Sequence, residues 1–231
     1  FRGIAMGKRP NFICRTVANP DPTLKFGELS IPKRYNTFLT LQEVITVYNY
    51  ERLKRFYEED EIVGIIPKNK IFVGGFLSVK NEDLKKKNRD LIKVGNKIIR
   101  KSIDGDILNH NRQPTLYKFG YLTFRCKFRP NEVFGMHMSV TTPYNADFDG
   151  DETVGIMLQS IGAQTEGRFL SNAESNYMST HANRNIMGLV FNCIAAVYML
   201  SKFICEIDKY DFAEAIKNCL INDEETANRL A

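Results

Sequence analysis

The sequence predicts an α+β fold, with strands in roughly the first two thirds of the chain and helices in the rest. Residues 121–128 and 133–140 alternate apolar and polar side chains with a period of two, which is typical of half-buried strands. Residues 164–172, 185–202 and 210–219 place their apolar side chains at helical spacing instead. A chain of 231 residues with 43% hydrophobic and 26% charged side chains can bury the core of one large domain or two small ones.

Two further elements are expected before residue 67. Residues 40–43 read Thr-Leu-Gln-Glu, the form of a helix capping box, and apolar residues then recur at helical spacing. We therefore expect a helix over about 41–58 that can break near Asn49. The apolar run 62–66 predicts a strand.

The remaining elements follow from the same patterns. Residues 70–79 indicate a short strand with a tight turn, and the lysine-rich residues 80–90 indicate an exposed loop. The two alternating stretches should pair with each other. They should lead straight into residues 144–152, called the acidic loop below. From Glu152 onward the chain should be helical, with a last helix from Asp223.

Charge is divided unevenly along the chain. Residues 1–130 hold 26 Lys or Arg against 13 Asp or Glu, whereas residues 131–231 hold 6 against 14. A basic part beside an acidic part suits a polyanion partner held by the first and a metal held by the second. Many of these lysines only keep exposed faces in water.

The cysteines and the apolar stretches favour an intracellular protein without a membrane span. The five cysteines are widely spaced and form no C-x-x-C pair, so we expect reduced, buried thiols and no zinc site. No charged-then-apolar leader opens the chain. The most apolar run, residues 186–200, is shorter than the ~20 residues that cross a bilayer and predicts a buried helix. We expect no membrane partner, and a location in the nucleus or cytoplasm.

Residues 144–152 read Tyr-Asn-Ala-Asp-Phe-Asp-Gly-Asp-Glu and contain the most informative pattern of the chain. In an extended segment, Asp147, Asp149 and Asp151 would stand on one face about 7 Å apart, too far to share one ion. Gly150 can adopt a positive φ and let the chain curl, so that the three carboxylates converge. Carboxylate oxygens suit Mg²⁺, which binds them at ~2.0–2.1 Å.

The acidic residues allow two other interpretations to be compared with a magnesium site. A calcium-binding EF-hand loop needs glycine at its sixth position and glutamate at its twelfth, where this chain has Glu152 and Leu158. That interpretation fails. A solvated acidic turn without a ligand stays open on the three aspartates alone.

The surrounding residues resemble a known family in four places, in the same order. Residues 139–152 closely resemble the metal-binding signature of the largest subunit of multisubunit DNA-dependent RNA polymerases. Residues 7–17 resemble its "GKR…F…RTV" element, residues 111–116 its "NRQPTL" loop, and residues 185–190 the start of a later helix. The resemblance implies a DNA-directed RNA polymerase, a nucleotidyltransferase, of which this chain would be a catalytic segment that is inactive alone.

The same resemblance implies the architecture. It predicts a double-psi β-barrel domain over residues 1–155, with an insert at about 58–100, whose loops converge on the metal. It predicts a mainly helical pore or funnel region over residues 156–231. Partners would be the second-largest and other polymerase subunits, the DNA template, the RNA transcript and ribonucleoside triphosphates.

Roles for single residues are carried over by position. Asp147, Asp149 and Asp151 match the three catalytic metal ligands and would hold one Mg²⁺, while a second Mg²⁺ arrives with the nucleotide. By the same resemblance, Arg112 and Asn145 would read the sugar hydroxyls of the nucleotide.

Four further positions carry an expected role. Pro114 would fix the shape of the NRQPTL loop, residues 111–116. Lys8, Arg9 and Arg15 would contact nucleic-acid phosphates, as sequence-independent binding requires.

The chain also departs from the family pattern. Tyr117 stands where the family usually continues "RQPTLH", Asn11 replaces an aspartate, and Thr153-Val154 replaces "MN". With the abundant Lys, Asn and Ile, these departures would fit a large DNA virus that carries its own polymerase, acting in the host cytoplasm or the virion. Two alternatives stay open: a double-barrel RNA-dependent RNA polymerase and a non-catalytic nucleic-acid-binding domain.

Overall fold

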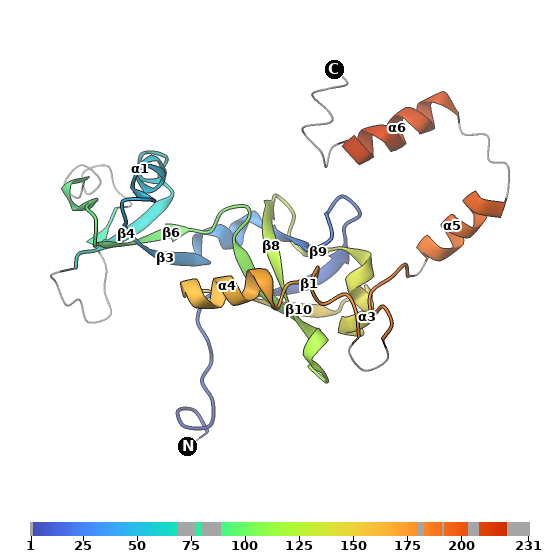
Figure 1. Cartoon of the computed structure of the whole chain (residues 1–231), viewed down its shortest axis with the longest axis horizontal. Coiled ribbons are helices and arrows are strands. Elements are labelled where there is room, and N and C mark those ends of the chain that lie inside the picture. The colour runs from blue at the N-terminus through green and yellow to red at the C-terminus, as the bar shows by residue number, and fades with distance from the viewer. Residues whose placement is uncertain are drawn as a thin grey trace.

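The computed structural model describes residues 2–68, 77–79, 89–179, 183–190, 192–202 and 208–220. Figure 1 shows a central barrel, with a smaller sheet to one side of it and two helices extending on the other side. The strands are β1 Ile13–Pro20, β2 Glu28–Pro32, β3 Thr40–Val44, β4 Ile62–Ile66, β5 Leu77–Ser78, β6 Lys97–Lys101, β7 Ile107–Asn111, β8 Tyr121–Arg129, β9 Phe134–Met136 and β10 Glu152–Met157. The α-helices are α1 Tyr50–Glu58, α3 Thr141–Tyr144, α4 Ile161–Phe169, α5 Asn192–Lys202 and α6 Lys209–Leu220. Short 3-10 turns cover Lys33–Thr37, Arg89–Leu91, Lys118–Gly120 and Met138–Val140.

Six of the described strands close the barrel in the order β1-β10-β7-β8-β2-β9. The pairs β1/β9 and β2/β8 are parallel and the other neighbours are antiparallel. The closed barrel with its helices confirms the expected α+β fold and is consistent with a double-psi β-barrel. The strand expected over 121–128 is present as β8, whose side chains Leu122, Phe124 and Cys126 point into the core.

The barrel core admits little extra volume beside β10. A Cβ built on Gly155 would lie 2.7 Å from Leu108 Cδ2 and 3.0 Å from Cys14 Sγ. Glycine at this position therefore lets β10 lie close to its neighbour β7, with which it pairs. Cys14 and Cys126 are buried free thiols, as expected, whereas Cys193 is a free thiol that is only half-buried. Cys205 and the side chain of Cys219 lie outside the described part.

The second sheet has the order β3-β6-β4-β5 and its own core. Helix α1 covers it with Leu53 and Tyr57, which are one turn apart and both buried. Arg100 on β6, only 3% exposed, donates to Glu43 on β3 and to both carboxylate oxygens of Asp106, which precedes β7. This buried ion-pair network joins the second sheet to the strand that leads into the NRQPTL loop.

The expected helix over 41–58 is wrong in its first half. Residues 40–44 form β3, which pairs in full register with β6, and the helix begins at Tyr50 after Asn49. The strand buries Leu41 in the barrel core, so tertiary pairing overrides the local capping pattern. The expected strand over 62–66 is confirmed as β4. Most of 70–79 and 80–90 lies outside the described residues.

Two predictions around the acidic loop are also wrong. Residues 133–140 form a strand only over β9, which pairs with β1 and β2 and not with β8. The backbone then turns, because the His137 ring accepts a hydrogen bond from Ser139 N–H and a 3-10 turn follows. Residues 152–157 are the barrel strand β10 and not the start of a helix. The sequence hides this strand because two of its inward positions are Thr153 and Gly155.

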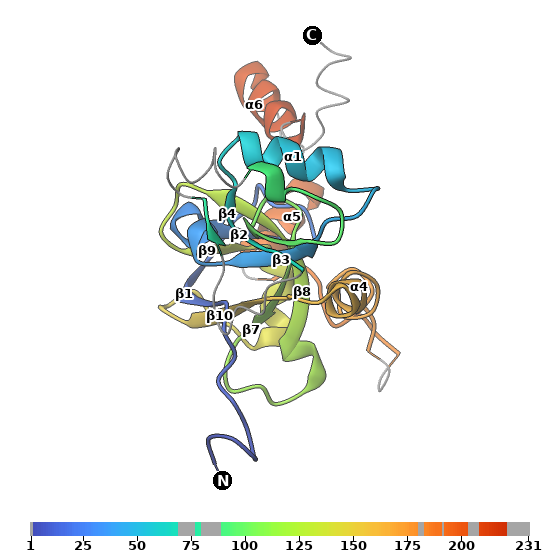
Figure 2. The same cartoon turned by 90° about the vertical axis from the view of Figure 1, so that its left-hand side faces the viewer.

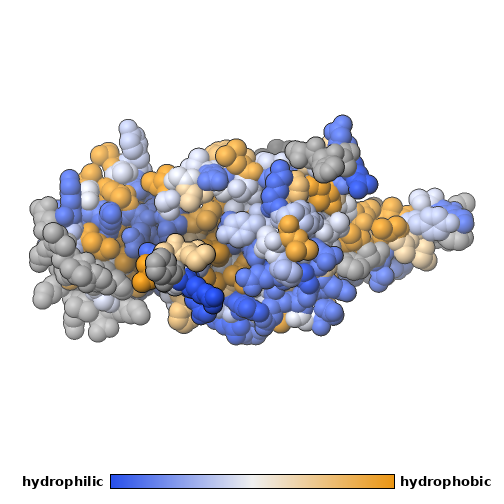
Figure 3. All heavy atoms as spheres, turned by 90° about the horizontal axis from the view of Figure 1, so that it is seen from below, coloured by the Kyte–Doolittle hydropathy of each residue, from blue (hydrophilic) through white to orange (hydrophobic). Residues whose placement is uncertain are grey.

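The predicted helix over 185–202 is shorter than expected and is not buried. Residues 185–190 are irregular, since Asn185 bridges to Met178, and α5 begins only at Asn192. No residue of α5 is buried, and its side chains Ile194 and Leu200 are 57% and 58% exposed. Figure 3 shows this apolar surface on the arm that extends from the barrel.

The other helices of the last third are placed as follows. The helices expected over 164–172 and 210–219 are present as α4 and α6, and residues 223–231 lie outside the described part. Figure 2 shows α4 beside β8, where Gly167 approaches Thr123 and Ile107. Among the described residues, no helix is long and apolar enough to span a membrane. The predicted division into domains stays a prediction, and β10 runs two residues past the boundary expected at 155.

Candidate active site

The acidic loop is held between α3 and β10. Helix α3 ends at Tyr144 and is capped by Asn145, whose backbone is left-handed with φ 47° and ψ 44°, a conformation that asparagine tolerates. The N–H groups of Asn145 and Ala146 bond back to carbonyls of α3 at 3.1 Å and 3.0 Å. The chain therefore turns sharply just before the first aspartate and re-enters the barrel at Glu152.

The loop bends at Gly150, which has the positive φ that the sequence predicts. Gly150 has φ 119° and open space where a side chain would lie. The backbone N–H of Asp147 donates to Asp151 Oδ2 at 3.0 Å, so the two ends of the aspartate series meet. Asp147 Oδ1 in turn accepts from Phe148 N–H at 2.8 Å, and the Phe148 ring packs against the barrel core.

The three carboxylates are not grouped as a metal site. Within the described residues, no three His, Cys, Asp or Glu side chains are placed to hold a metal ion. Asp147 and Asp149 are exposed, and Asp151 is half-buried and occupied by hydrogen bonds. The donor set, three carboxylates on one curled loop, nevertheless fits a hard cation such as Mg²⁺. Their role as metal ligands stays a prediction.

Arg112 and Asp151 form a half-buried ion pair in the site. Arg112 Nε donates to Asp151 Oδ2 at 2.7 Å, and the two side chains are 19% and 22% exposed. The hydrogen bond from Arg112, followed by the one from Asp147 N–H, lowers the pKa of Asp151 below its ordinary value. Asp151 is therefore ionised at neutral pH, as a metal ligand must be.

A pocket of about 270 Å³ lies beside the acidic loop. The three residues expected to bind substrate, Arg112, Pro114 and Asn145, all line it. Five other residues complete its wall: Leu116, Tyr117, Gly120, Pro143 and Tyr144. The structure thus brings two motifs that are some thirty residues apart in sequence to one cavity, although their roles there remain predictions.

Two hydrogen-bonded side chains that the motif assignments left without a role hold this pocket together. The Tyr144 hydroxyl donates to the His110 carbonyl at 2.9 Å and accepts from Leu122 N–H at 3.3 Å, so it ties α3 to β7 and β8. Asn111 Nδ2 donates to Thr115 Oγ1 and to the Gly120 carbonyl at 2.5 Å and 2.7 Å, which closes the loop 112–120. The sequence gives a signal for both residues only through their position next to Arg112 and Asn145.

His110 lies behind the pocket in the barrel core. It is fully buried against the edges of Phe124, Phe134 and Tyr144, and burial lowers its pKa to about 3. Neither ring nitrogen has a hydrogen-bond partner within the described part of the chain. The imidazole is therefore neutral at physiological pH and acts as a packing group. His137 is half-buried and makes the turn-capping bond given above.

The residues expected to contact nucleic acid are not gathered at the pocket. Lys8 and Arg9 are exposed on the segment before β1, which Figure 1 shows leaving the barrel. Arg15 on β1 is also exposed, but its Nη2 lies 2.6 Å from Glu152 Oε2. A phosphate would have to compete with Glu152 for this guanidinium.

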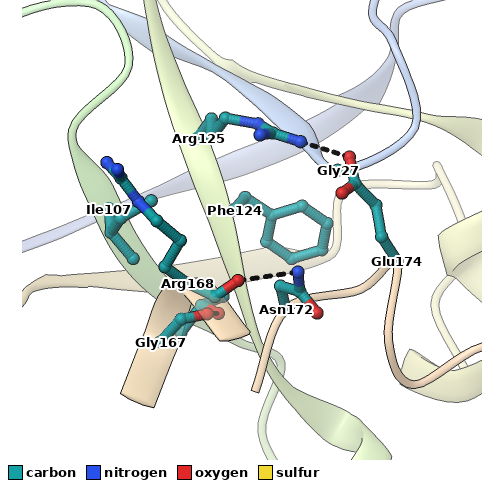
Figure 4. A pocket seen from close by; sticks show the side chains of 9 residues that line it. Gly27, Ile107, Phe124, Arg125, Gly167, Arg168, Asn172 and Glu174 are labelled. Atoms are coloured by element: carbon teal, nitrogen blue, oxygen red, sulfur yellow. Dashed lines mark hydrogen bonds and ion pairs between the residues drawn. The ribbon is translucent and has the colours of Figure 1, made fainter. Parts of the chain in front are cut away.

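A second cavity lies between β8, α4 and the chain after α4 (Figure 4). Arg125 pairs there with Glu174, and Asn172 Nδ2 donates to the Arg168 carbonyl at 2.8 Å. Its volume of about 20 Å³ is close to the room that one water molecule needs. It is too small for a substrate.

The sequence is similar to known transcription proteins. The family described as "RNA polymerase Rpb1, domain 2" matches residues 7–173. "DNA-directed RNA polymerase subunit Rpo1N" of Halobacterium salinarum is 34% identical over 202 residues, 87% of this chain and 21% of that protein. "DNA-directed RNA polymerase III subunit RPC1" of Debaryomyces hansenii is 32% identical over 234 residues, 97% of this chain and 15% of that protein. The chain thus spans about a fifth or less of the length of these two relatives.

Proposed function

Because the chain belongs to the family of Rpb1 domain 2 of RNA polymerases, we propose that it is the catalytic segment of a DNA-directed RNA polymerase largest subunit. It would act within the assembled enzyme, beside the second-largest subunit and the other subunits, on a DNA template and an RNA transcript. The observation that carries the proposal is the shared cavity: Arg112, Pro114 and Asn145 line one pocket next to the acidic loop.

In the proposed reaction the 3′-hydroxyl of the RNA attacks the α-phosphorus of a ribonucleoside triphosphate. A new P–O bond forms, pyrophosphate leaves, and the hydroxyl proton is released. Asp147, Asp149 and Asp151 would hold one Mg²⁺, and a second would come with the nucleotide. When bound, the metal ions lower the pKa of the attacking hydroxyl and neutralise charge on the leaving phosphates.

The protein's own side chains would position the nucleotide. Arg112 offers a rigid fork of donors, and the Asn145 amide offers both a donor and an acceptor. Both line the pocket, so the sugar hydroxyls of a bound ribonucleotide can meet both residues there. Hydrogen bonds to the 2′-hydroxyl are the contacts that separate ribonucleotides from deoxyribonucleotides. Pro114 would shape the loop that carries Arg112.

Nucleic-acid binding would use the exposed basic residues outside the pocket. Lys8 and Arg9 are exposed on the segment before β1, where a phosphate can reach them. Arg15 would exchange Glu152 for a phosphate. Such contacts are independent of sequence and weaken with salt, as an enzyme that moves along any template requires.

The viral origin suggested by the residue usage is also a proposal.

RNA extension by the assembled polymerase tests the function. Asp149→Asn keeps the size of the side chain and removes its charge, and we expect it to slow extension by at least about a hundredfold. Asp90→Asn is the matched control, because Asp90 is exposed in the 3-10 turn Arg89–Leu91, away from the acidic loop in sequence. The polymerase with this substitution should extend RNA at the wild-type rate. Equal rates for Asp149→Asn and the wild type would contradict the proposal.

One alternative has an observation in its favour. The three aspartates are not grouped for a metal in the described residues, which is what a non-catalytic nucleic-acid-binding domain would also look like. The two functions differ in the Asp149→Asn experiment, because a non-catalytic domain would leave RNA extension unchanged.

A further inference from the structure

The pocket beside the acidic loop is lined by residues of two chemical kinds. Arg112 and Asn145 offer hydrogen-bonding side chains. Pro114, Leu116 and Tyr117 line the same pocket with apolar surface. A ligand that matches both kinds of residue combines a hydrogen-bonding part with a flat apolar part, as a nucleoside does.

The size of the pocket agrees with such a ligand. Its volume of about 270 Å³ lies just below the ~300–1,000 Å³ range of pockets that enclose drug-sized molecules. A base with its sugar fits this space, whereas the triphosphate would extend out of it. The acidic loop adjoins the pocket at Asn145. The triphosphate of a bound nucleotide can therefore extend out of the pocket towards the predicted metal ligands.

Tyr117 is held in place with part of its ring free. Its backbone is extended, with φ −154° and ψ 167°, and its carbonyl accepts from Gly120 N–H at 3.0 Å. Its ring meets the buried Phe119 edge-on, with centroids 6.1 Å apart and planes at 67°. The side chain remains 46% exposed. The Tyr117 ring thus contacts Phe119 and still has exposed aromatic surface where it lines the pocket.

An exposed aromatic face of this kind suits a nucleobase. Every base has a π-face, so stacking on an aromatic side chain stabilises a bound nucleotide without selecting its sequence. Tyr117 and Arg112 lie in the same loop, which the Asn111 side chain holds by its bonds to Thr115 and Gly120. The loop can therefore present a sugar-binding group and a base-binding surface together.

We propose that Tyr117 is a nucleoside-binding residue, whose ring packs against the base of the ribonucleotide while its sugar lies against Arg112 and Asn145. The inference rests on the proposed polymerase function and assigns the base side of its substrate pocket. Tyr117 is a position where the chain departs from the family pattern. Under this inference Tyr117 contributes to the affinity for nucleotides and not to the choice between ribose and deoxyribose.

Steady-state kinetics of the assembled polymerase, with each of the four ribonucleoside triphosphates, tests this role. Tyr117→Ala should raise the KM for nucleotides by about tenfold and leave kcat within a factor of about two, because ground-state stacking is lost. The increase should be larger for ATP and GTP than for CTP and UTP, since purines stack over a larger area. Tyr117→Phe keeps the ring and should restore the wild-type KM.

Tyr121→Ala is the matched control. Tyr121 is similarly exposed, at 42%, but does not line the pocket, so its KM should equal that of the wild type. If Tyr117→Ala does not assemble, Tyr117→Leu is measured by the same criteria, because leucine keeps an apolar side chain without a flat ring.

The outcomes separate this inference from the proposed function. An unchanged KM in Tyr117→Ala, an effect of equal size for all four nucleotides, or a fall in kcat alone overturns the role of Tyr117. If RNA extension depends on Asp149 in the same preparation, the polymerase function stands and only this inference fails. If extension does not depend on Asp149, the proposed function itself fails.

Discussion

Arg112 Nε donates to Asp151 Oδ2 at 2.7 Å, so a predicted sugar-binding residue is joined directly to a predicted metal ligand. The contact links the NRQPTL loop, whose Arg112 lines the pocket, to the acidic loop. A cation bound by Asp151 would compete with the guanidinium for the same carboxylate. Metal binding and recognition of the sugar are therefore expected to influence each other.

Arg112→Ala should weaken the preference for ribonucleotides over deoxyribonucleotides by about ten- to a hundredfold. Arg112 is a charged donor, and a hydrogen bond to a charged group is worth about 1.5–3 kcal/mol. The measurement is the ratio of kcat/KM for ATP and dATP in the assembled polymerase. Arg55→Ala, on the exposed face of α1, is the control. If Arg112→Ala shows the same ratio as the wild type, Arg112 does not bind the sugar.

Tyr144→Phe should lower the free energy of unfolding by about 1–2 kcal/mol, because it removes the bonds to the His110 carbonyl and Leu122 N–H. Denaturant unfolding of the chain measures this loss. Tyr48→Phe changes a fully exposed hydroxyl and should have no effect. If both substitutions are equally harmless, Tyr144 does not hold α3 to the barrel.

Gly155→Ala should destabilise the barrel by about 1–3 kcal/mol, since the added methyl group would lie within 3.0 Å of Leu108 and Cys14 side-chain atoms. Gly162→Ala in α4 adds the same methyl group where nothing lies within 4 Å. That control should be neutral or slightly stabilising, because alanine favours helix. Thermal unfolding of the two variants compares them, and a Tm for Gly155→Ala at or above that of Gly162→Ala contradicts the packing described.

His110 should make the stability depend on pH. Its pKa is about 3 in the folded chain and about 6.5 when unfolded, so the unfolded state binds one more proton between these values. Stability should therefore fall as the pH drops below about 6.5, by up to about 1.4 kcal/mol per pH unit. His110→Phe removes this contribution while the carboxylates still titrate. Urea unfolding from pH 7 to pH 4 measures both slopes, and identical slopes would show that His110 is not buried as a neutral group.

Strands and helices could be predicted where apolar side chains repeat with a clear period. They could not be predicted where pairing between distant segments decides the local structure. β8 was predictable because Leu122, Phe124 and Cys126 alternate with polar residues. β10 was missed because Thr153 and Gly155 point inward and carry no apolar signal. The capping pattern at Thr40 misled, because pairing with β6 stabilises an extended chain there.

The site could be anticipated further than the fold around it. The motifs identified Arg112, Pro114 and Asn145, which the structure brings to one cavity. Asn111 and Tyr144 were given no role, because a buried hydrogen bond between distant segments leaves no periodic trace in a sequence. The exposure of α5 was not foreseen either, since an apolar run predicts burial without naming its partner.

Cleavage by bound iron gives the most direct measurement of the metal site. In the assembled polymerase, Fe²⁺ replaces Mg²⁺, and ascorbate with peroxide then generates hydroxyl radicals that cut the nearby backbone. Three carboxylates that hold one ion predict cuts near residue 112 and within residues 145–151, and their loss on addition of Mg²⁺ or in Asp149→Asn. Cuts absent from these segments in the wild type, or unchanged in Asp149→Asn, would contradict the presence of a divalent cation at this loop.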